Sequence, residues 1–484
     1  MIDYSALVKT CDAEIREGKI SAAAAKLRVL NVARIPSKWR LPLANLCRRA
    51  RVVSQGLRLL APIVRDGKTG SRPGGTPQEI AEYAMLLEKI GGLHEALGLL
   101  GSISGPAVPE ALFARSACLI GQWEYGEAIG YLKSYVAIAP NDYLKLVGQL
   151  NLGAALVAVG NAAEAESVLN QAMEASRTQK LSRVFANCLT LRAQLLIQTR
   201  DHARAVEDLN EASRILGLSG TLDQLYTRKW LAIIEAGDKR SIEPLKDVRA
   251  EALARGDWAT VREAELHGLS IEFDEKVANR LYFGTPQPAY RRRMSELLNW
   301  TPKTSSFKFG SGPAVLAVSD AQIEGLDVSM EAGRQVHRVV CALFRDLYAP
   351  SRTGTLFAAI FADEYFDADS SPVRIRKAIW RARRWIEETG LPLEIAEEGG
   401  AYTANLNDGL AVELTAEVKP KSSNEDLLSK LALVPGQTFR APDAAKKLGL
   451  SKSSFHRFTQ WAIEAGALEK EGSGTSTRYR AKAA

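Results

Sequence analysis

Histidine and cysteine are the side chains best suited to metal binding and catalysis, but their spacing in this sequence supports neither. His337 and Cys341 are one helical turn apart, as half of a metal site would be, but no further ligand pair stands at metal-site spacing. The remaining histidines are scattered: His94, His202, His267 and His456. The motifs H-E-x-x-H, C-x-x-C and G-x-S-x-G are absent. We therefore predict an ordinary amphipathic helix at His337, no metal, no cofactor and no enzyme activity.

A phosphate-binding loop has one candidate, the segment DGKTG at 66–70, which contains Gly-Lys-Thr. Such a loop needs a further glycine five residues before the glycine that precedes the lysine. That position holds Pro62, so the motif fails.

A second segment that could contact phosphate is SPVRIRKAIWRARRWIEETG at 371–390. It carries six basic residues and no acid between Val373 and Trp385. Ser371 and Pro372 predict the start of a helix and Gly390 its end. Helical spacing predicts one buried stripe: Ile375, Ile379, Ala382 and Ile386. It predicts a cationic ridge on another face: Arg374, Lys377, Arg381 and Arg384. A ridge of this kind suits DNA phosphates and guanine edges.

Acidic segments flank this ridge and leave an alternative open. The loop FADEYFDADSSP precedes the helix, and Glu397-Glu398 follows it. Acids there would repel phosphate. The ridge would then pair with an acidic protein surface instead of DNA.

A second basic region lies at the C-terminus, where residues 421–484 hold 11 Lys and Arg against 6 Asp and Glu. The segment SKSSFHRFTQWAIEAGAL predicts a helix with Ser451 as N-cap. Its exposed start offers side chains to DNA: Lys452, Ser453, Ser454, His456, Arg457 and Gln460. A Gly/Ser hairpin follows, and it contributes Arg478 and Arg480.

The elements that precede these regions repeat. A small residue with a leucine four positions later recurs at intervals of 33, 40, 32, 37 and 40 residues. The pairs are Ala23/Leu27, Gly56/Leu60, Ala96/Leu100, Ala128/Leu132, Ala165/Leu169 and Ala205/Leu209. In three of them a glycine lies five residues before the alanine: Gly18, Gly91 and Gly160. The pattern predicts helical hairpins, in which a small residue admits the partner helix and hairpins stack to cover one another.

The segments LLEKIGGLHEALGLL and LVAVGNAAEAESVL resemble the second half of the tetratricopeptide repeat, a helix–turn–helix unit. The resemblance covers about residues 10–215 and implies a solenoid over residues 1–275. It also implies a concave groove for a peptide, a partner protein or a small signal. A helical scaffold without a ligand is the alternative.

The helices and strands expected after residue 311 follow an order that is known from one family of proteins. Strands are expected at 314–320 and 325–329 and helices at 334–348, 354–366 and 371–390, followed by a strand, a Gly-Gly turn and a strand at 391–406. This order resembles the winged-helix effector domain of bacterial response regulators. The resemblance implies that residues 312–414 form such a domain, with the third helix in the major groove of DNA.

The C-terminal strings A-x-x-L-G-L-S-x-S-S-F, E-A-G-A-L-E and R-Y-R resemble the winged helix-turn-helix of small bacterial repressors. The resemblance implies a second winged helix at 425–484. Composition predicts linkers at 276–311 and 415–424, and we expect the run Arg291–Arg293 to be a solvated turn.

Net charge is +7, which permits a nucleic-acid partner. We expect neither a signal peptide nor a membrane span, and five distant cysteines suit reduced thiols in the cytoplasm. The sequence thus predicts a mainly α protein: a tetratricopeptide-like helical-hairpin array followed by two small α+β winged-helix domains. We expect a cytoplasmic bacterial transcriptional regulator that binds double-stranded DNA. The alternative is a non-enzymatic scaffold whose winged helices contact proteins.

Overall fold

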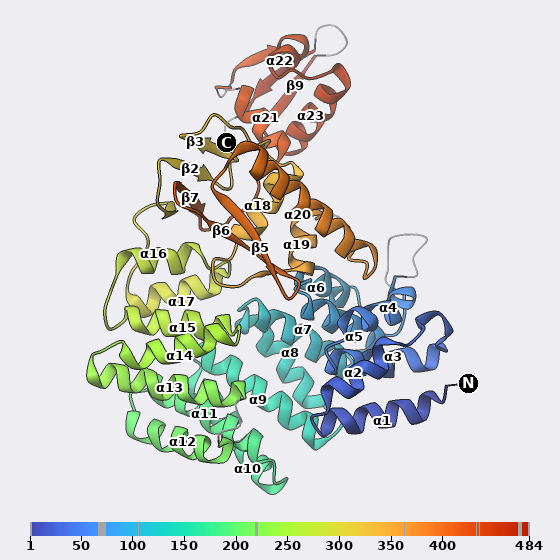
Figure 1. Ribbon diagram of the computed structural model, residues 1–484, viewed down its shortest axis with the longest axis vertical. Coiled ribbons are helices and arrows are strands. Elements are labelled where there is room, and N and C mark those ends of the chain that lie inside the picture. Colours follow the sequence, from blue (N-terminus) through green and yellow to red (C-terminus); the bar gives the residue numbers. More distant parts are fainter. Residues whose placement is uncertain are drawn as a thin grey trace.

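The computed structural model describes residues 2–65, 74–104, 106–217, 221–362, 364–431, 433–434, 436–472 and 477–482. The DGKTG segment lies outside this described part of the chain. The protein is mainly helical, with an array of antiparallel helix pairs followed by two smaller α+β regions (Figure 1). Among the described helices, none has the length and apolar character that crossing a membrane requires. All five cysteines are free, as the sequence predicted, and all five are buried.

The array runs from α1 to α17. Its first half comprises α1 (Tyr4–Arg16), α2 (Ile20–Arg28), the 3-10 turn η1 (Val32–Arg34), α3 (Ser37–Arg49), α4 (Val53–Val64), α5 (Pro77–Lys89), α6 (Leu93–Gly101), α7 (Pro109–Gly121) and α8 (Tyr125–Ile138). Its second half comprises α9 (Asp142–Ala158), α10 (Ala162–Thr178), α11 (Ser182–Gln198), α12 (His202–Leu216), α13 (Leu222–Lys239), α14 (Glu243–Ala254), α15 (Trp258–Leu269), α16 (Glu275–Phe283) and α17 (Pro288–Leu298).

The small-residue and leucine pairs lie at the helix contacts, as predicted. Both members of all six pairs are buried. At Gly56 an added Cβ would lie 2.7 Å from a methyl group of Leu86, so a larger residue would force Leu86 to shift. Gly18, Gly91 and Gly160 have positive φ angles and form the turns between paired helices. These contacts confirm the predicted helical-hairpin array.

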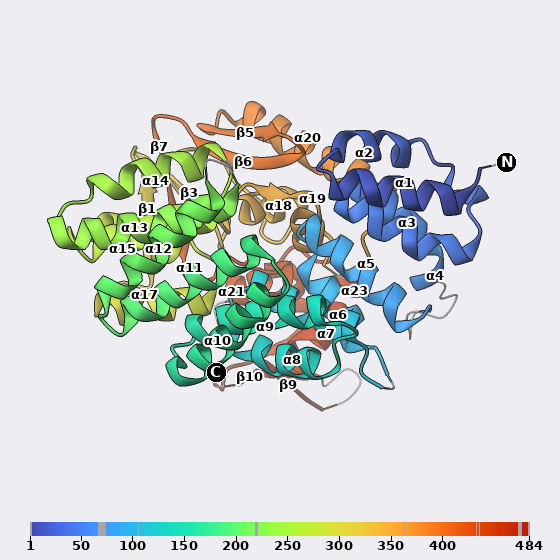
Figure 2. The same ribbon diagram turned by 90° about the horizontal axis from the view of Figure 1, so that it is seen from below.

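The array curls until its middle meets its end (Figures 1 and 2). Trp123 lies in the turn between α7 and α8, and its ring stands edge-on to that of Tyr290 on α17 at 4.6 Å between centroids. The curled array therefore has a first arm, α1–α7, and a last arm, α13–α17, on either side of its middle helices.

The linker predicted for 276–311 is wrong, because these residues form most of α16, all of α17 and strand β1 (Ser306–Gly310). The proline and glycine composition was misleading: Pro288 occupies the first turn of α17, where proline is tolerated. The run Arg291–Arg293 is not a solvated turn. Arg291 is buried and donates to the carbonyl oxygens of Thr285 and Ala416 at 2.9 and 2.6 Å.

The central region, residues 306–415, contains two sheets. The first has the order β1-β7-β2-β3, with β2 (Ala314–Ala317), β3 (Gln322–Glu324) and β7 (Leu410–Thr415). Strand β7 pairs antiparallel with β1 and parallel with β2. The strand expected at 325–329 is wrong, because the chain turns at Gly325 after β3, with φ +80°.

Three helices and a hairpin complete the central region. They are α18 (Gln335–Phe344), α19 (Thr353–Ile360), α20 (Ser370–Thr389), β5 (Leu393–Glu398) and β6 (Ala401–Leu406). The short β4 (Ser351–Arg352) extends the hairpin into a sheet of order β4-β6-β5. Helix α19 ends at Ile360, six residues earlier than expected, so that Tyr365 and Phe366 lie in a loop.

This central region lies above the array in Figure 1 and contacts both of its arms. On the first arm, the backbone N–H of Gly354 donates to the carbonyl of Ile90 at 2.8 Å, and a Cβ at Gly354 would collide with that backbone. On the last arm, the N–H of Leu347 donates to the carbonyl of Gly284 at 3.0 Å. One apolar core joins helices α1–α7 to α18–α20.

The C-terminal region has its own small core. It comprises α21 (Ser423–Leu431), β8 (Thr438–Arg440), α22 (Ala441–Lys447), α23 (Lys452–Glu464), β9 (Leu468–Glu471) and β10 (Arg478–Ala481), with sheet order β8-β10-β9. Phe455 and Phe458 of α23 pack with Tyr479 of β10 in that core. The sheet and core thus hold α23 against the hairpin.

Candidate nucleic-acid interface

The predicted buried stripe of α20 is confirmed. Ile375, Ile379, Ala382 and Ile386 are all buried in the central core. Ser371 is not the N-cap, because the helix already includes Ser370. Asp367 instead accepts from the backbone N–H of Ser370 at 2.7 Å, and Ser371 is buried and accepts from the N–H of Asp367. Gly390 ends the helix in a left-handed conformation, as predicted.

The cationic ridge does lie on the other side of α20, but most of its side chains are already engaged. Arg374 is half-buried, forms an ion pair with Glu364 and lies 4.0 Å from the ring centre of Phe361. The hydrogen bond from Arg374 lowers the pKa of Glu364. This contact ties the first ridge residue to the acidic loop before the helix.

Farther along the ridge, Arg381 donates to the side-chain oxygen of Gln335 at 2.7 Å, and Arg384 pairs with Glu388 at 2.7 Å. Lys377 is exposed and forms no ion pair or side-chain hydrogen bond among the described residues. Beside it Trp380 is 58% exposed, which is unusual for so large an apolar ring. The outward face of α20 therefore carries an exposed tryptophan between exposed cations.

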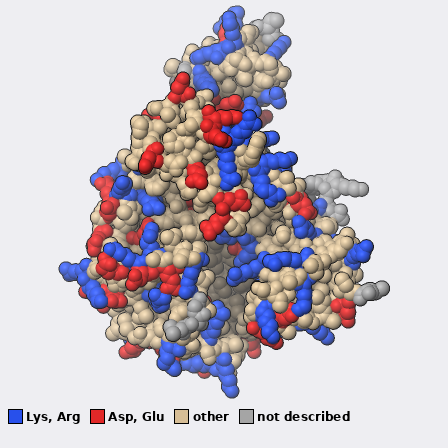
Figure 3. Space-filling view, in the orientation of Figure 1, with Lys and Arg blue, Asp and Glu red and all other residues tan. Residues whose placement is uncertain are grey.

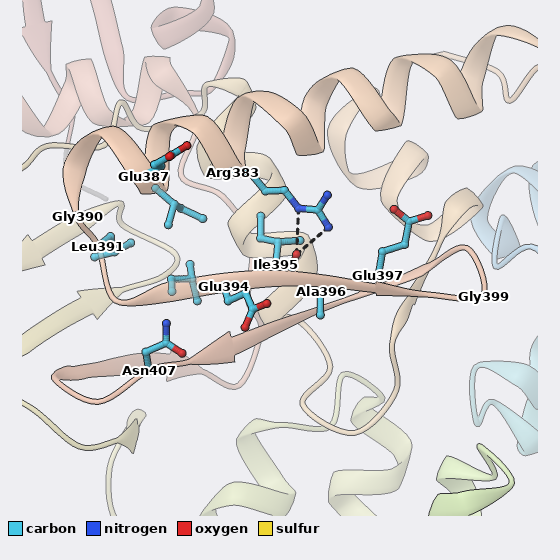
Figure 4. Close-up of a pocket in the computed structure, with 12 residues that line it drawn as sticks. Arg383, Glu387, Gly390, Leu391, Glu394, Ile395, Ala396, Glu397, Gly399 and Asn407 are labelled. Atoms are coloured by element: carbon cyan, nitrogen blue, oxygen red, sulfur yellow. Dashed lines mark hydrogen bonds between the residues drawn. The ribbon is translucent and has the colours of Figure 1, made fainter.

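Beneath the C-terminal half of α20 lies an open cavity of about 1020 Å³ against strand β5 (Figure 4). Arg383 reaches across it and donates to the carbonyl of Ile395 through Nε and Nη2, at 3.0 and 2.7 Å. The other charged residues lining the cavity are acidic: Glu387, Glu394 and Glu397. This excess of carboxylates disfavours a phosphate there.

The C-terminal helix α23 begins as predicted. Ser451 is its N-cap and accepts from the backbone N–H of Ser454 at 3.2 Å. The Ser454 hydroxyl is 3.0 Å from that of Ser451, so Ser454 serves the cap and is partly buried. The other predicted side chains of α23 are exposed: Lys452, Ser453, His456, Arg457 and Gln460.

The exposed cations of α23 differ from most of those on the α20 ridge in their lack of an ion pair. In the described part of the C-terminal region, neither Lys452 nor Arg457 forms an ion pair. Figure 3 shows basic side chains gathered on this region at the top of the molecule, whereas acidic side chains lie among the basic ones lower down. The start of α23 therefore presents free cations and free polar groups.

The hairpin strand β10 places Arg478 and Arg480 on the solvent side of the sheet, with buried Tyr479 between them. Arg480 pairs with Glu471 at 2.6 Å. Arg478 lies opposite Arg440 of β8, which is also exposed. On its other side, Arg478 lies opposite Glu471 of β9, so an acidic residue of the chain stands next to this pair of arginines. Sequence reasoning missed Arg440, because only the strand register brings it beside Arg478.

His337 and Cys341 are buried, and their side chains form hydrogen bonds with backbone groups. The N–H of Gly333 donates to Nδ1 of His337, and Nε2 lies 2.8 Å from the carbonyl oxygen of Val318. The Cys341 thiol donates to the same oxygen. Across the described residues, no group of three or more His, Cys, Asp or Glu side chains is placed to hold a metal ion.

Comparison with known proteins gives limited matches. No family model matches the sequence, and no curated protein matches it. Solved structures similar to this chain include a Rap protein complexed with competence and sporulation factor, at 13% identity and a TM-score of 0.44. Others are the apo form of RapI, at 12% and 0.36, and a tetratricopeptide repeat protein from Parabacteroides merdae, at 15% and 0.33. Each covers 61% of this chain, and they are covered over 92%, 99% and 97% of their own lengths.

Proposed function

We propose that the chain is a cytoplasmic bacterial transcriptional regulator that is not an enzyme. Its helical array docks a peptide or protein partner, and two winged helices, one in the central and one in the C-terminal region, bind duplex DNA. The C-terminal winged helix is the main reader of the DNA, and the central one contributes less.

The order of elements supports two winged helices. In the C-terminal region a helix and a short strand precede two helices and a hairpin, and all three strands form one sheet. In the central region a small sheet precedes three helices and a hairpin. In both regions the last helix before the hairpin carries the basic residues.

The observation that carries the proposal is the outward face of α23. Lys452, His456 and Arg457 are exposed at the start of a capped helix whose other face is buried. Such helix starts supply base-edge and phosphate contacts in winged and helix-turn-helix proteins. Arg440 and Arg478 add two cations on the neighbouring sheet.

The contact between array and central region supports control of DNA binding by a docked partner. Arg262 of α15 pairs with Asp346, and the Tyr348 hydroxyl donates to Glu265 of the same helix. Both pairs are largely buried, so their geometry depends on how α15 sits. A partner that moves α15 would move the segment that precedes α19 and α20.

The test is a mobility shift with the full chain and a mixed pool of duplex DNA at low and moderate salt. We expect a shift at low salt that weakens at moderate salt, because the contacts are largely to phosphates. The control is Lys239→Ala with Lys246→Ala, which removes two array cations that are paired within their own helices. No shift with any duplex at low salt would refute DNA binding.

A second candidate function is a scaffold whose winged helices contact proteins. The engaged ridge of α20, its acidic neighbours and exposed Trp380 favour it for the central region. In that case Trp380→Ala removes binding of a partner protein and leaves DNA affinity unchanged.

A further inference from the structure

Helix α23 has one outward side, because its opposite side is fixed in the C-terminal core. Phe455, Phe458 and Ala462 are buried in that core, and all three lie on the same side of the helix. Exposed residues spaced by four and three form a row on the other side: Ser453, Arg457 and Gln460. The core therefore holds this row toward solvent in a fixed direction.

Two members of the row have long polar side chains that no other group engages. Within the described part of the chain, Arg457 forms no ion pair, and neither Arg457 nor Gln460 forms a side-chain hydrogen bond. Ser453 differs, because its hydroxyl lies 3.2 Å from that of the N-cap Ser451. Arg457 and Gln460 can therefore bind a ligand without giving up a partner in the protein.

The chemistry of these two side chains matches two different bases. The guanidinium group of Arg457 offers only donors, in a fixed fork, which fits the two acceptors O6 and N7 of guanine. The amide of Gln460 offers a donor and an acceptor, which fits N7 and N6 of adenine. In the major groove, no other base presents either of these two pairs of atoms.

The spacing of the two residues is compatible with the spacing of base pairs. Three residues advance along a helix axis by about 4.5 Å, and successive base pairs are about 3.4 Å apart. Two long side chains of one row therefore reach neighbouring base pairs when the helix lies in the major groove. Exposed Lys452 and His456 lie together on one flank of the row, which is the position for contacts with the phosphates that border the groove.

We infer that α23 reads a guanine and an adenine in neighbouring base pairs, the guanine through Arg457 and the adenine through Gln460. This inference rests on the proposed binding of duplex DNA by the C-terminal winged helix and adds which bases that helix selects. A contact of Arg457 with phosphate alone would give affinity without a base preference, and the experiment separates the two cases.

The experiment mixes the full chain with a pool of random duplex DNA at low salt, and retained duplexes are amplified, selected again and sequenced. We expect an enriched motif in which a G·C pair stands beside an A·T pair. Labelled duplexes that differ from this motif by one base pair are then titrated by fluorescence anisotropy. Replacement of either pair should weaken binding about tenfold, because one bidentate contact is lost.

Two variants assign the contacts to their side chains. Gln460→Glu keeps the length of the side chain but leaves only acceptors, which suit the N4 amino group of cytosine. We expect this variant to prefer cytosine in place of adenine at one position and to keep the guanine. Arg457→Ala should lose the preference for guanine and keep that for adenine. A misfolded helix cannot create a new base preference, so the result with Gln460→Glu does not depend on a loss of folding.

The matched contrast is Lys452→Ala, which removes an exposed cation from the flank of the same helix. It should weaken binding equally for every sequence and leave the motif unchanged. If Gln460→Glu and Arg457→Ala both bind duplex DNA with the motif of the unchanged chain, the inference is overturned and DNA binding stands. If the unchanged chain retains no duplex at low salt, the inference and the proposed DNA binding are both overturned.

Discussion

Helix α20 carries six Lys and Arg residues and α23 carries only two, but the two helices stand in different surroundings. On α20, Arg374 and Arg384 are bound to acids of the same chain, and Arg381 to a glutamine. On α23, the exposed cations Lys452 and Arg457 have no acidic partner in the described part of the C-terminal region. Cations already paired within a protein must exchange one partner for another on binding DNA, so they add less affinity.

Position within the molecule separates the two helices as well. Helix α20 belongs to a region that both arms of the array contact, and Arg58 of α4 pairs with Asp369 just before its first turn at 2.8 Å. Helix α23 belongs to a region with its own core at one end of the molecule (Figure 1). We therefore expect the partners of the basic residues, more than their number, to decide how strongly each helix binds DNA.

The largest expected effect is that of salt. If about five cations of the chain meet phosphates, the slope of log affinity against log salt is roughly −4 to −5. Affinity then falls about 10⁴-fold for a tenfold rise in salt. Titration of a labelled duplex by fluorescence anisotropy measures the slope. A slope near zero would mean that neither helix binds DNA through its phosphates.

The next effect is that of the C-terminal pair of arginines. Arg457→Ala with Arg478→Ala removes one helix contact and one hairpin contact, and we expect about 10- to 100-fold weaker binding. The salt slope should also become shallower by about 1 for each phosphate that the variant no longer neutralises. Lys239→Ala with Lys246→Ala is the charge-matched control. Unchanged affinity would mean that α23 does not touch the duplex.

The central pair gives a smaller effect and tests the comparison directly. Lys377→Ala with Arg381→Ala removes two ridge cations, of which Arg381 is already bound to Gln335. We expect about threefold weaker binding, measured on the same duplex. A reduction as large as that of the C-terminal pair would contradict the comparison. It would show that partners within the chain do not decide which helix contributes more to DNA affinity.

The smallest effect runs in the opposite direction. Glu364→Gln releases Arg374 from its ion pair and removes one acid from the loop before α20. An exposed pair of this kind contributes little, so DNA affinity should rise only about two- to threefold. Anisotropy at low salt resolves such a change. Weaker binding by this variant would mean that the pair holds α20 in its DNA-binding position.

The sequence predicted features that depend on local spacing. The period of Ile375, Ile379 and Ile386 identified the buried side of α20, because a helix repeats every 3.6 residues. The cap at Ser451 and the turn at Gly390 were also predictable, since each depends on the chemistry of a single residue. The exposed residues of α23 followed from the same rules.

Contacts between distant segments could not be predicted in this way. The pairs Arg58–Asp369 and Gly354–Ile90 join residues more than 250 positions apart, and neither segment indicates its partner. Composition was misleading at 276–311, because proline also occurs at helix starts, as at Pro288, and glycine at helix ends, as at Gly284. The run Arg291–Arg293 was misjudged because its partners, Ala416 and Glu263, lie far away in sequence.

The core that the first arm shares with the central region also constrains how the protein is made. Apolar side chains of α4–α6 pack in one cluster with Leu356, Ile379 and Leu410, which a ribosome adds roughly 300 residues later. During synthesis at about 5–20 residues per second, the apolar surface of α4–α6 remains uncovered for on the order of tens of seconds. Contacts between residues so far apart in sequence also form slowly during folding. We therefore expect the nascent first arm to depend on a chaperone until the central region has been made.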